Sequence, residues 1–419
     1  QTYIDPNQCV LCGRCAAVCP VSLPDGGKPL RFTGRQSLPG RPVIEKSRQP
    51  QCQTECPLGV NAQAYIALTR VGRYQEALDV VRRDNVLPGI CGRVCTHPCE
   101  AACRRGELDE SLAIRDIKRF VADYEKSHAR APSIKSTPAR EEKIAVVGSG
   151  PAGLAAAADL ARMGYPVTVF EKETEAGGLL RYGIGPHRLP RDILDYDLEY
   201  VRGSGVEMVT SHEVNVFQSL DRLREDFKAV ILTVGSWTDR KLGVPGEDLE
   251  GVEGCLSALN RLYREGLDTR GEAKQQEALQ GEALAVIGDG NAAFDTARTM
   301  KRLGADVTII SWFSQDQIPA DREEVKQARE EGIAIVDQTQ VTAFSGRNGR
   351  LTHLTCRSTQ PGPPDANGIA WPVMVPSAEP FELNFSRVIV AIGQAGAFPA
   401  PTESSGNGDP AGLRTTPYG

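Results

Sequence analysis

Ten of the twelve cysteines in this 419-residue chain precede residue 104, and only Cys255 and Cys356 follow. Several of the early cysteines are separated by two residues, a spacing typical of metal or iron–sulfur ligation in a reducing compartment rather than of disulfides. We therefore expect a cytoplasmic protein with a cysteine-ligated N-terminal region. The chain begins at Gln1 without an initiator Met, so we expect upstream sequence to be missing.

The length predicts roughly two to four domains. A net charge of −6 and a pI near 5.6 give no reason to expect nucleic acid or an anionic membrane as a partner. No apolar run of about eighteen residues occurs, so we expect no membrane span. We predict five parts: a ferredoxin-like 4Fe–4S segment and linker (1–48), a helical iron–sulfur domain (49–130), an FAD-binding domain (141–260), an NAD(P)-binding domain (281–390) and a return toward the FAD domain (391–419).

The first cysteine motif is C-x-x-C-x-x-C, extended to the C-x2-C-x2-C-x3-C-P run of ferredoxin-type cubane sites. Its candidate ligands are Cys9, Cys12, Cys15 and Cys19. Short spacers let one tight loop aim three thiolates at one cluster. The fourth cysteine of such a run usually serves another cluster, so the first cluster needs a fourth ligand from elsewhere. The segment also resembles the cluster region of the large iron–sulfur subunit of NADH dehydrogenases, which implies Cys52 or Cys56 for that role.

A second group of candidate ligands comprises Cys52, Cys56, Cys91, Cys95, Cys99 and Cys103. The last four are spaced four apart and could line one helix face, but Gly92 and Pro98 argue against a continuous helix, so we favour ligation from loops. Residues 61–83 show helical periodicity. His97 is a candidate ligand, although a turn residue or a donor to cluster sulfur is the better interpretation.

The segments Cys56-Pro-Leu-Gly59, Leu87-Pro-Gly-Ile-Cys-Gly-Arg-Val-Cys95 and Arg119-Phe-Val-Ala-Asp123 resemble the N-terminal helical domain of the glutamate synthase small subunit family. This resemblance covers residues 50–419 and implies a domain that holds two 4Fe–4S clusters. Family members commonly carry a C-x-x-C pair where this chain has Ser47-Arg-Gln-Pro50. Ten cysteines suffice for two cubanes, so we predict two clusters and leave open which cysteine serves which; a third would need outside or non-cysteine ligands.

A first dinucleotide fingerprint follows a strand pattern at 143–147. It reads Gly148-Ser-Gly150-Pro151-Ala152-Gly153, opens an alanine-rich helix to Met163 and is followed by a second strand that ends at Glu171. In this Rossmann pattern the first glycine makes the tight turn and the second lets the backbone approach the pyrophosphate. The third packs the helix, and the acid accepts from ribose hydroxyls.

The next segment indicates FAD by resemblance. Gly177-Gly-Leu-Leu-Arg-Tyr-Gly183 and Arg188-Leu-Pro190 are similar to the family's flavin-contacting stretch, and 230–235 to the point where the chain leaves the flavin domain. The implied contacts are Gly178, Leu179, Arg181, Gly183, Leu189 and Gly235. Tyr182 and Leu189 could instead be core residues, although we favour flavin contact.

A second fingerprint follows the strand pattern 283–287 and has the family shape G-x-G-N-x-x-x-D. Its candidate residues are Gly288, Gly290, Asn291, Ala292 and Asp295, with the pyrophosphate of NAD(P)H expected on the helix N-terminus. NADP-linked relatives place an Arg pair after the next strand, whereas this chain has Ser311-Trp-Phe-Ser-Gln315. We therefore favour NADH over NADPH. Trp312 is a candidate for stacking on adenine, with simple packing equally open.

Gly393 resembles the point of return to the flavin domain, and the chain ends at Gly419, before the family's last flavin-contacting segment, so we expect truncation there. The charged run 321–331 is interpreted as a solvated helix face, and Cys255 and Cys356 as buried structural thiols.

The predicted fold class is α/β, with two Rossmann-like dinucleotide-binding domains preceded by a helical iron–sulfur domain and a short ferredoxin-like segment. The predicted function is an electron-transfer flavoprotein subunit of a hetero-oligomeric complex. It oxidises NAD(P)H at FAD and passes electrons singly through the clusters to a partner redox subunit or ferredoxin, and the reverse direction is equally allowed. No catalytic side chain is expected, because the cofactors carry the chemistry. The alternatives are a glutamate synthase small subunit proper and a non-catalytic electron-wire or scaffold subunit with a vestigial nicotinamide site.

Overall fold

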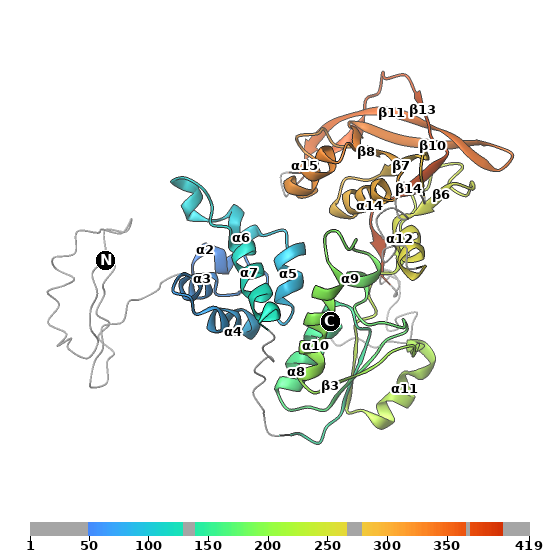
Figure 1. Ribbon diagram of the computed structural model, residues 1–419. Helices are drawn as coiled ribbons and strands as arrows, with labels where there is room; N and C mark the ends of the chain where they lie inside the picture. Colours follow the sequence, from blue (N-terminus) through green and yellow to red (C-terminus); the bar gives the residue numbers. More distant parts are fainter. Residues whose placement is uncertain (1–48, 129–138, 266–278, 366–368, 397–419) are drawn as a thin grey trace.

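The computed structural model describes residues 49–128, 139–265, 279–365 and 369–396. A helical unit, blue to cyan in Figure 1, lies beside two sheet-containing units, one green and one yellow to red. No helix in these ranges is long and apolar enough to cross a membrane. The mixed α/β architecture expected from the sequence is confirmed.

The helical unit is built from short helices around one apolar core. They are α2 (Gln51–Thr54), α3 (Ala62–Arg70), α4 (Tyr74–Asp84), α5 (Pro88–Val94), α6 (Pro98–Ala101), the 3-10 helix η1 (Arg104–Glu107) and α7 (Ile114–Ser127). Tyr65, Leu78 and Val81 are almost completely buried in the core. The periodic stretch 61–83 forms two helices because Gly72, at φ 76°, breaks it.

The cysteine-rich stretch is not one helix. Cys91 lies in α5 and Cys99 in α6, whereas Cys95 and Cys103 lie at helix ends. His97, at φ 43°, turns the chain between α5 and α6, and Pro98 starts the new helix. The absence of one continuous helix agrees with the expectation from Gly92 and Pro98, although two of the four cysteines lie in short helices rather than in loops.

The first Rossmann unit has a parallel sheet in the order β3-β2-β1-β4. Its strands are β1 (Ile144–Val147), β2 (Val167–Phe170), β3 (Val206–Val209) and β4 (Ala229–Leu232), and its helices are α8 (Pro151–Arg162), α9 (Leu179–Tyr182), α10 (Arg191–Gly203) and α11 (Val216–Asp226). This order is one half of a dinucleotide-binding fold, in which ligands bind at the carboxyl edge of the strands.

The second Rossmann unit has a parallel sheet in the order β6-β14-β7-β8-β9. Its elements are β6 (Val252–Gly254), α12 (Cys255–Arg264), β7 (Ala283–Ile287), α14 (Asn291–Arg302), β8 (Asp306–Ile310), α15 (Arg322–Glu330), β9 (Ala334–Val336) and β14 (Arg387–Val390). The FAD-binding domain was expected to reach residue 260, but β6 pairs with β14, so the first unit ends earlier. An antiparallel sheet covers one face and comprises β10 (Thr339–Arg347), β11 (Arg350–Pro364), β12 (Ala370–Met374) and β13 (Phe381–Asn384).

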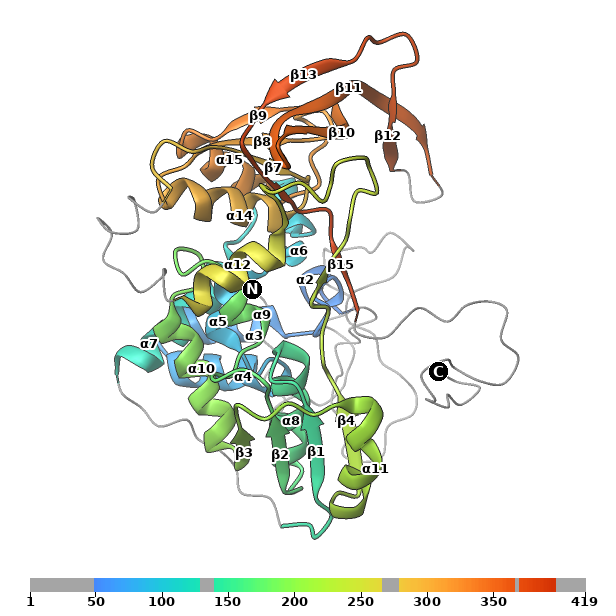
Figure 2. The same cartoon turned by 90° about the vertical axis from the view of Figure 1, so that its right-hand side faces the viewer.

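The chain enters the second Rossmann unit through a short strand that pairs with the last strand described. Strand β5 (Thr238–Asp239) leads into the second unit, and β15 (Gln394–Ala395), labelled in Figure 2, follows β14 and pairs antiparallel with β5. Asp239 also accepts the backbone N–H groups of Leu256 (2.8 Å) and Ser257 (3.0 Å) at the start of α12. Strand β5 is thereby fixed to the first helix of the unit it enters.

The helical unit docks firmly on α10. The buried carboxylate of Asp197 accepts the backbone N–H of Ile90 at 2.9 Å, at the start of α5. Burial raises the pKa of Asp197 to about 7, against the opposing effect of that N–H and of Arg82. Arg82 also pairs with Glu125 inside the helical unit (2.6 Å), and Tyr196 of α10 donates to the same carboxylate at 2.9 Å.

Candidate functional site

The first glycine turn lies at the carboxyl edge of β1 and needs glycine at two positions. A Cβ on Gly148 (φ 104°) would lie 2.4 Å from the carbonyl oxygen of Thr233. A Cβ on Gly153 would lie 2.0 Å from the carbonyl oxygen of Gly148. Gly150 faces open space, with no atom of the described chain within 4 Å of its built Cβ. Its backbone is therefore free for close approach by a ligand.

This turn opens into a cavity of about 570 Å³. Eight of the residues predicted to contact FAD line it, namely Gly148, Gly150, Pro151, Ala152, Glu171, Gly178, Leu179 and Gly235. The residues that sequence reasoning missed are Val147, Phe170, Lys172, His212, Glu213, Val214, Asn215, Thr233, Val234 and Trp237. The stretch 212–215 follows β3, whose carboxyl end meets the same sheet edge, and that placement is the signal that could have found it.

Glu171 holds the turn together from the end of β2. Its Oε2 accepts from the backbone N–H (2.9 Å) and the hydroxyl (2.5 Å) of Ser149, and its Oε1 accepts from the N–H of Glu173 at 2.9 Å. The Ser149 hydroxyl in turn accepts the N–H of Gly177 at 3.0 Å. Since a carboxylate oxygen offers two acceptor positions, Oε1 keeps one for a ribose hydroxyl.

Four of the residues predicted from the flavin-contacting resemblance or the fingerprint do not line this cavity. Gly153 lies in α8 beneath the turn, and Gly183 follows α9. Leu189 is fully buried in the core of the first unit. Arg181 is buried and donates from Nε to the carbonyl of Ala176 at 2.9 Å. Tyr182, the residue weighed between core and flavin contact, also lies in a core cluster.

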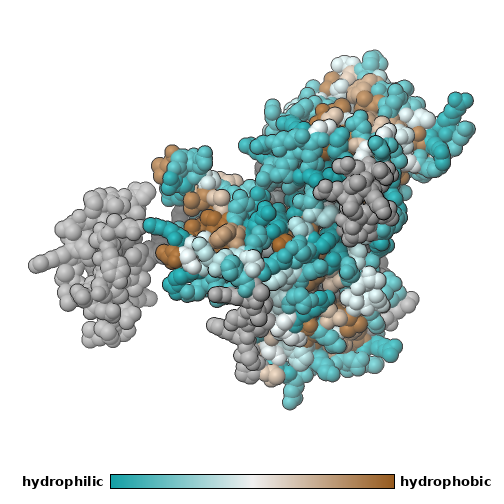
Figure 3. Space-filling view, viewed as in Figure 1, coloured by the Kyte–Doolittle hydropathy of each residue, from teal (hydrophilic) through white to brown (hydrophobic). Residues whose placement is uncertain are grey.

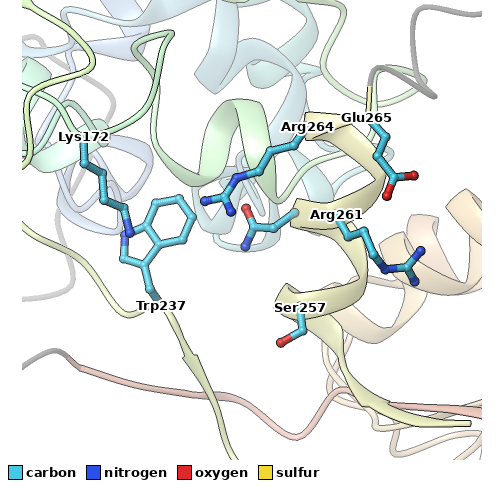
Figure 4. Close-up of a pocket in the computed structure, with 7 residues that line it drawn as sticks. Lys172, Trp237, Ser257, Arg261, Arg264 and Glu265 are labelled. Carbon is cyan, nitrogen blue, oxygen red and sulfur yellow. The ribbon is translucent and has the colours of Figure 1, made fainter. Parts of the chain in front are cut away.

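A second cavity of about 470 Å³ adjoins the first and shares Lys172 and Trp237 with it. The Lys172 ammonium lies 4.6 Å from the centroid of the Trp237 ring. Figure 4 shows Arg264 extending from α12 toward these two side chains, whereas Arg261 extends the other way. The cavity therefore continues the FAD-type pocket toward the second unit, with cationic groups on its wall.

The second glycine turn has the same backbone geometry but different neighbours. A Cβ on Gly288 (φ 151°) would lie 2.3 Å from the carbonyl oxygen of Ala391, whereas Gly290 faces open space. The Asn291 side chain accepts the backbone N–H of Asp321 at 2.7 Å. The Ser311 hydroxyl donates to Asp289, whose pKa is raised by burial. The polar side chains of this turn, Asp289 and Asn291, are therefore already bonded to residues of the segment between β8 and α15.

The remaining predicted residues of this site lie around the turn. Ala292 follows Asn291 in the first turn of α14 and is exposed. Asp295, one turn further on, is buried and pairs with Arg188 from the stretch before α10. Burial raises the pKa of Asp295 to about 6, although Arg188 opposes the shift. Asp295 therefore joins the two Rossmann units.

The charged run 321–331 is not simply the solvated helix face expected from the sequence. Glu324 in α15 is buried and lies 3.2 Å from Arg188 and 2.8 Å from Arg298. Val325 and Ala328 are buried as well. The periodicity of the sequence did not predict that Glu324 is buried, because the arginines that neutralise its charge come from other elements.

The segment after β8 contains Trp312 and carries no Lys or Arg between residues 303 and 321. Trp312 is half-buried; its carbonyl accepts from the Thr359 hydroxyl at 2.6 Å, and its indole N–H has no partner within the described residues. Phe313 packs against Trp371 of β12, with 5.9 Å between ring centroids. Gly393 lies just before β15, and its carbonyl accepts the N–H of Arg240 at 3.1 Å.

The six cysteines of the helical unit are free and partly buried. Burial, and then the thiol of Cys95, raise the pKa of Cys99 to about 11, and burial with the thiol of Cys103 raises the pKa of Cys52. No three His, Cys, Asp or Glu side chains converge on a single-ion position in the described ranges. A cubane spreads its thiolates over separate irons, so neighbouring thiols at helix ends fit 4Fe–4S ligation. Cys9, Cys12, Cys15 and Cys19 lie outside the described residues, and so does Gly419, where truncation is expected.

Comparison with family models matches the chain in three places. Residues 45–130 match dihydropyrimidine dehydrogenase domain II with its 4Fe-4S cluster, and residues 2–22 match a 4Fe-4S binding domain. Residues 142–397 match the pyridine nucleotide-disulphide oxidoreductase family. The small chain of the NADPH glutamate synthase of Halomonas elongata is 31% identical, over 82% of this chain and 73% of that protein.

This chain belongs to the family of glutamate synthase small-subunit-like oxidoreductases that carry FAD and iron–sulfur clusters. It is also 39% identical to the beta subunit of the NADP(+)-dependent formate dehydrogenase of Moorella thermoacetica, over 82% of this chain and 51% of that protein. The beta subunit of the NADPH-Fe(3+) oxidoreductase of Geobacter sulfurreducens is 38% identical, over 84% and 52%. The chain thus spans about half the length of these two relatives.

Among solved structures, FprA of Mycobacterium tuberculosis in complex with NADPH superposes with a TM-score of 0.51. The identity is 20%, over 63% of this chain and 73% of that one. This likeness supports the fold of this family member, with its two Rossmann units.

Proposed function

We propose that this chain is the NAD(P)H-oxidising electron-transfer subunit of a larger redox complex. Reduced pyridine nucleotide binds at the second glycine turn, and FAD occupies the 570 Å³ cavity at the first. FAD, when bound, takes two electrons as a hydride and releases them one at a time. The observation that carries the proposal is the contact of the cysteine-bearing unit with both Rossmann units, through Asp197 of the first and Glu323 of the second.

The side chains of this family member supply binding and position. The α8 N-terminus and the free backbone at Gly150 receive the FAD pyrophosphate, and Glu171 receives the adenosine ribose. The α14 N-terminus at Gly290 does the same for the pyridine nucleotide. Arg188 and Asp295 hold the two units in register, so that the two ligands meet at a fixed geometry.

We propose NADH as the preferred donor, although the relatives above are named for NADP(H). A 2′-phosphate needs cationic partners, and the segment from 303 to 321 offers none. The same segment carries Asp316, which is exposed and adds negative potential, and Asp306 at its start is also acidic. Both features disfavour the additional charge of NADPH.

The partner is proposed to be a second redox subunit or ferredoxin. The relatives are named as beta subunits or small chains, which supports a multisubunit assembly. Figure 3 shows apolar residues exposed on the helical unit, where Leu58, Leu108 and Leu112 reach solvent. Such side chains beside the cysteines are suited to contact with a partner. A glutamate synthase small chain proper is the second candidate, favoured by the 73% coverage of the Halomonas protein.

An anaerobic titration of the reconstituted protein tests the proposal. We expect NADH to bleach the bound flavin at lower concentration than NADPH, and iron analysis to give about eight atoms per chain, as two cubanes require. Absence of bleaching by either donor would favour the scaffold alternative. If addition of a glutamate synthase large subunit restored glutamate formation, that result would favour the second candidate.

A further inference from the structure

The first turn of α15 touches the cysteine-bearing unit. Arg115 of α7 extends Nη2 to the Glu323 carboxylate at 2.6 Å. Its other terminal nitrogen, Nη1, lies 3.1 Å from Nδ1 of His97 and 3.5 Å from the carbonyl oxygen of Cys95. The guanidinium thus connects the turn that follows Cys95 to the second Rossmann unit.

His97 ties this contact to the sulfur atoms. Its backbone N–H donates to Cys95 Sγ at 3.3 Å, and its left-handed conformation sets the direction of the chain into α6 and Cys99. The N–H of Arg115 donates to the Glu100 carboxylate at 2.6 Å, which fixes α6 to the start of α7. A movement of Arg115 would therefore move the segment that carries both cysteines.

The same turn of α15 touches the nucleotide turn and the flavin-side stretch. The N–H of Asp321 donates to the Asn291 side chain at 2.7 Å, and Asp321 Oδ1 caps α15 by accepting the N–H of Glu323 at 2.9 Å. Glu324 lies 3.2 Å from Arg188. Three successive contacts therefore place the cysteine segment relative to both dinucleotide turns.

We infer that Arg115 is a positioning residue for electron transfer, which through Glu323 holds the Cys95–Cys99 segment at a fixed separation from the flavin site. This inference rests on the proposed function. Arg115 touches neither dinucleotide turn, so it acts on the passage of electrons to the clusters and not on hydride transfer. Electron transfer rates fall steeply with distance, so a small displacement of the segment is measurable.

The Arg115–Glu323 ion pair is suited to fixing the position of the cysteine segment rather than to stabilising the fold. The Glu323 side chain is 47% exposed, so solvent screens the ion pair and it adds little to folding stability. Arg115 itself is 17% exposed and has several partners, so its orientation is well determined. Loss of the pair should loosen the cysteine segment without unfolding the domain.

The variants Arg115→Gln and Glu323→Gln test the inference, with Arg73→Gln as the matched control. Arg73 pairs with Glu76 within the helical unit, at an exposed site that reaches neither Rossmann unit. In anaerobic rapid mixing with NADH, we expect flavin reduction to stay at the wild-type rate and the following cluster-reduction phase to slow at least tenfold in the two test variants. The charge-exchanged double variant Arg115→Glu with Glu323→Arg should recover at least part of the rate.

Hydrogen–deuterium exchange of the cluster-loaded proteins gives a readout independent of electron flow. We expect faster exchange across residues 95–103 in Arg115→Gln and unchanged exchange in Arg73→Gln. A wild-type cluster phase with wild-type exchange in Arg115→Gln would overturn the inference. If NADH fails to reduce the flavin of the wild-type protein, the proposed function fails, whereas the exchange experiment still decides whether Arg115 positions the segment.

Discussion

The two glycine turns share a fingerprint and a sheet edge but differ in what surrounds them. The turn at Gly148–Gly150 opens into a 570 Å³ cavity and is braced by Glu171 from within its own unit. The turn at Gly288–Gly290 is braced by Ser311 and by the backbone of Asp321. The helix that follows Asp321 contacts the other two units through Glu323 and Glu324. A preformed pocket suits a ligand that stays bound, whereas a turn connected to neighbouring units suits one that comes and goes.

The largest effect should come from the first turn. Gly153→Ala places a methyl group 2.0 Å from the Gly148 carbonyl oxygen, so we expect loss of FAD and of the folded first unit. Gly150→Ala meets no atom of the described chain, so we expect the fold to survive while FAD retention falls. Circular dichroism and flavin content measure the two outcomes. Equal behaviour of the two variants would contradict the separate roles assigned to these glycines.

The next effect concerns the bracing between units. Asp295→Ala leaves Arg188 buried without its closest carboxylate, and removal of one partner of a buried pair costs about 3–5 kcal/mol. The control is Asp306→Ala, which removes an exposed partner of Lys301 and should cost less than about 1 kcal/mol. Denaturant unfolding compares them. Similar costs for the two variants would mean that the Arg188 contact does not hold the units together.

A smaller effect is expected at the second turn. Gly290→Ala adds a methyl group where the nucleotide pyrophosphate is expected, and no atom of the described chain opposes it. The KM for NADH should rise about tenfold, equivalent to roughly 1.4 kcal/mol of binding, with unchanged FAD content. Steady-state kinetics with an artificial acceptor measures this. Loss of FAD instead of nucleotide affinity would reverse the assignment of the two turns.

The remaining effect is a pH dependence at the join between the units. Burial, followed by Arg298 and Arg302, lowers the pKa of His187 from 6.5 to about 3. Below pH 6.5, His187 therefore binds a proton in the unfolded chain but stays neutral in the folded chain until the pH approaches 3. Stability from this source is complete above pH 6.5 and is lost as the pH falls toward 3, by at most about 1.4 kcal/mol per pH unit.

The matched variant is His187→Gln, which has no titrating group at this position. Its thermal midpoint should fall less steeply between pH 6.5 and 4.5 than that of the wild-type protein. Equal slopes in the two proteins would show that His187 is accessible to protons in the folded state.

The sequence predicted those elements whose pattern lies within a short stretch of the chain. The strands at 144–147 and 283–287 and the helices after each fingerprint follow from apolar runs and glycine placement. The sequence could not supply partners that are distant along the chain. The ion pair of Asp295 with Arg188 and the burial of Leu189 depend on elements far along the chain, and so does the bond of the buried Arg181 to Asp195. The early end of the first unit was also hidden, because β6 is three residues long and pairs with β14, more than a hundred residues away.

The bonds made by β5 have a consequence for how the second Rossmann unit can move. Strand β5 carries the chain into that unit, pairs there with β15, and through Asp239 bonds to the first residues of α12. A linker bonded in this way cannot swing freely about the helix that it enters. Any displacement of α12, which carries Arg264 and part of the wall of the 470 Å³ cavity, would therefore displace β5 with it, so the link behaves as part of the second unit rather than as a slack tether.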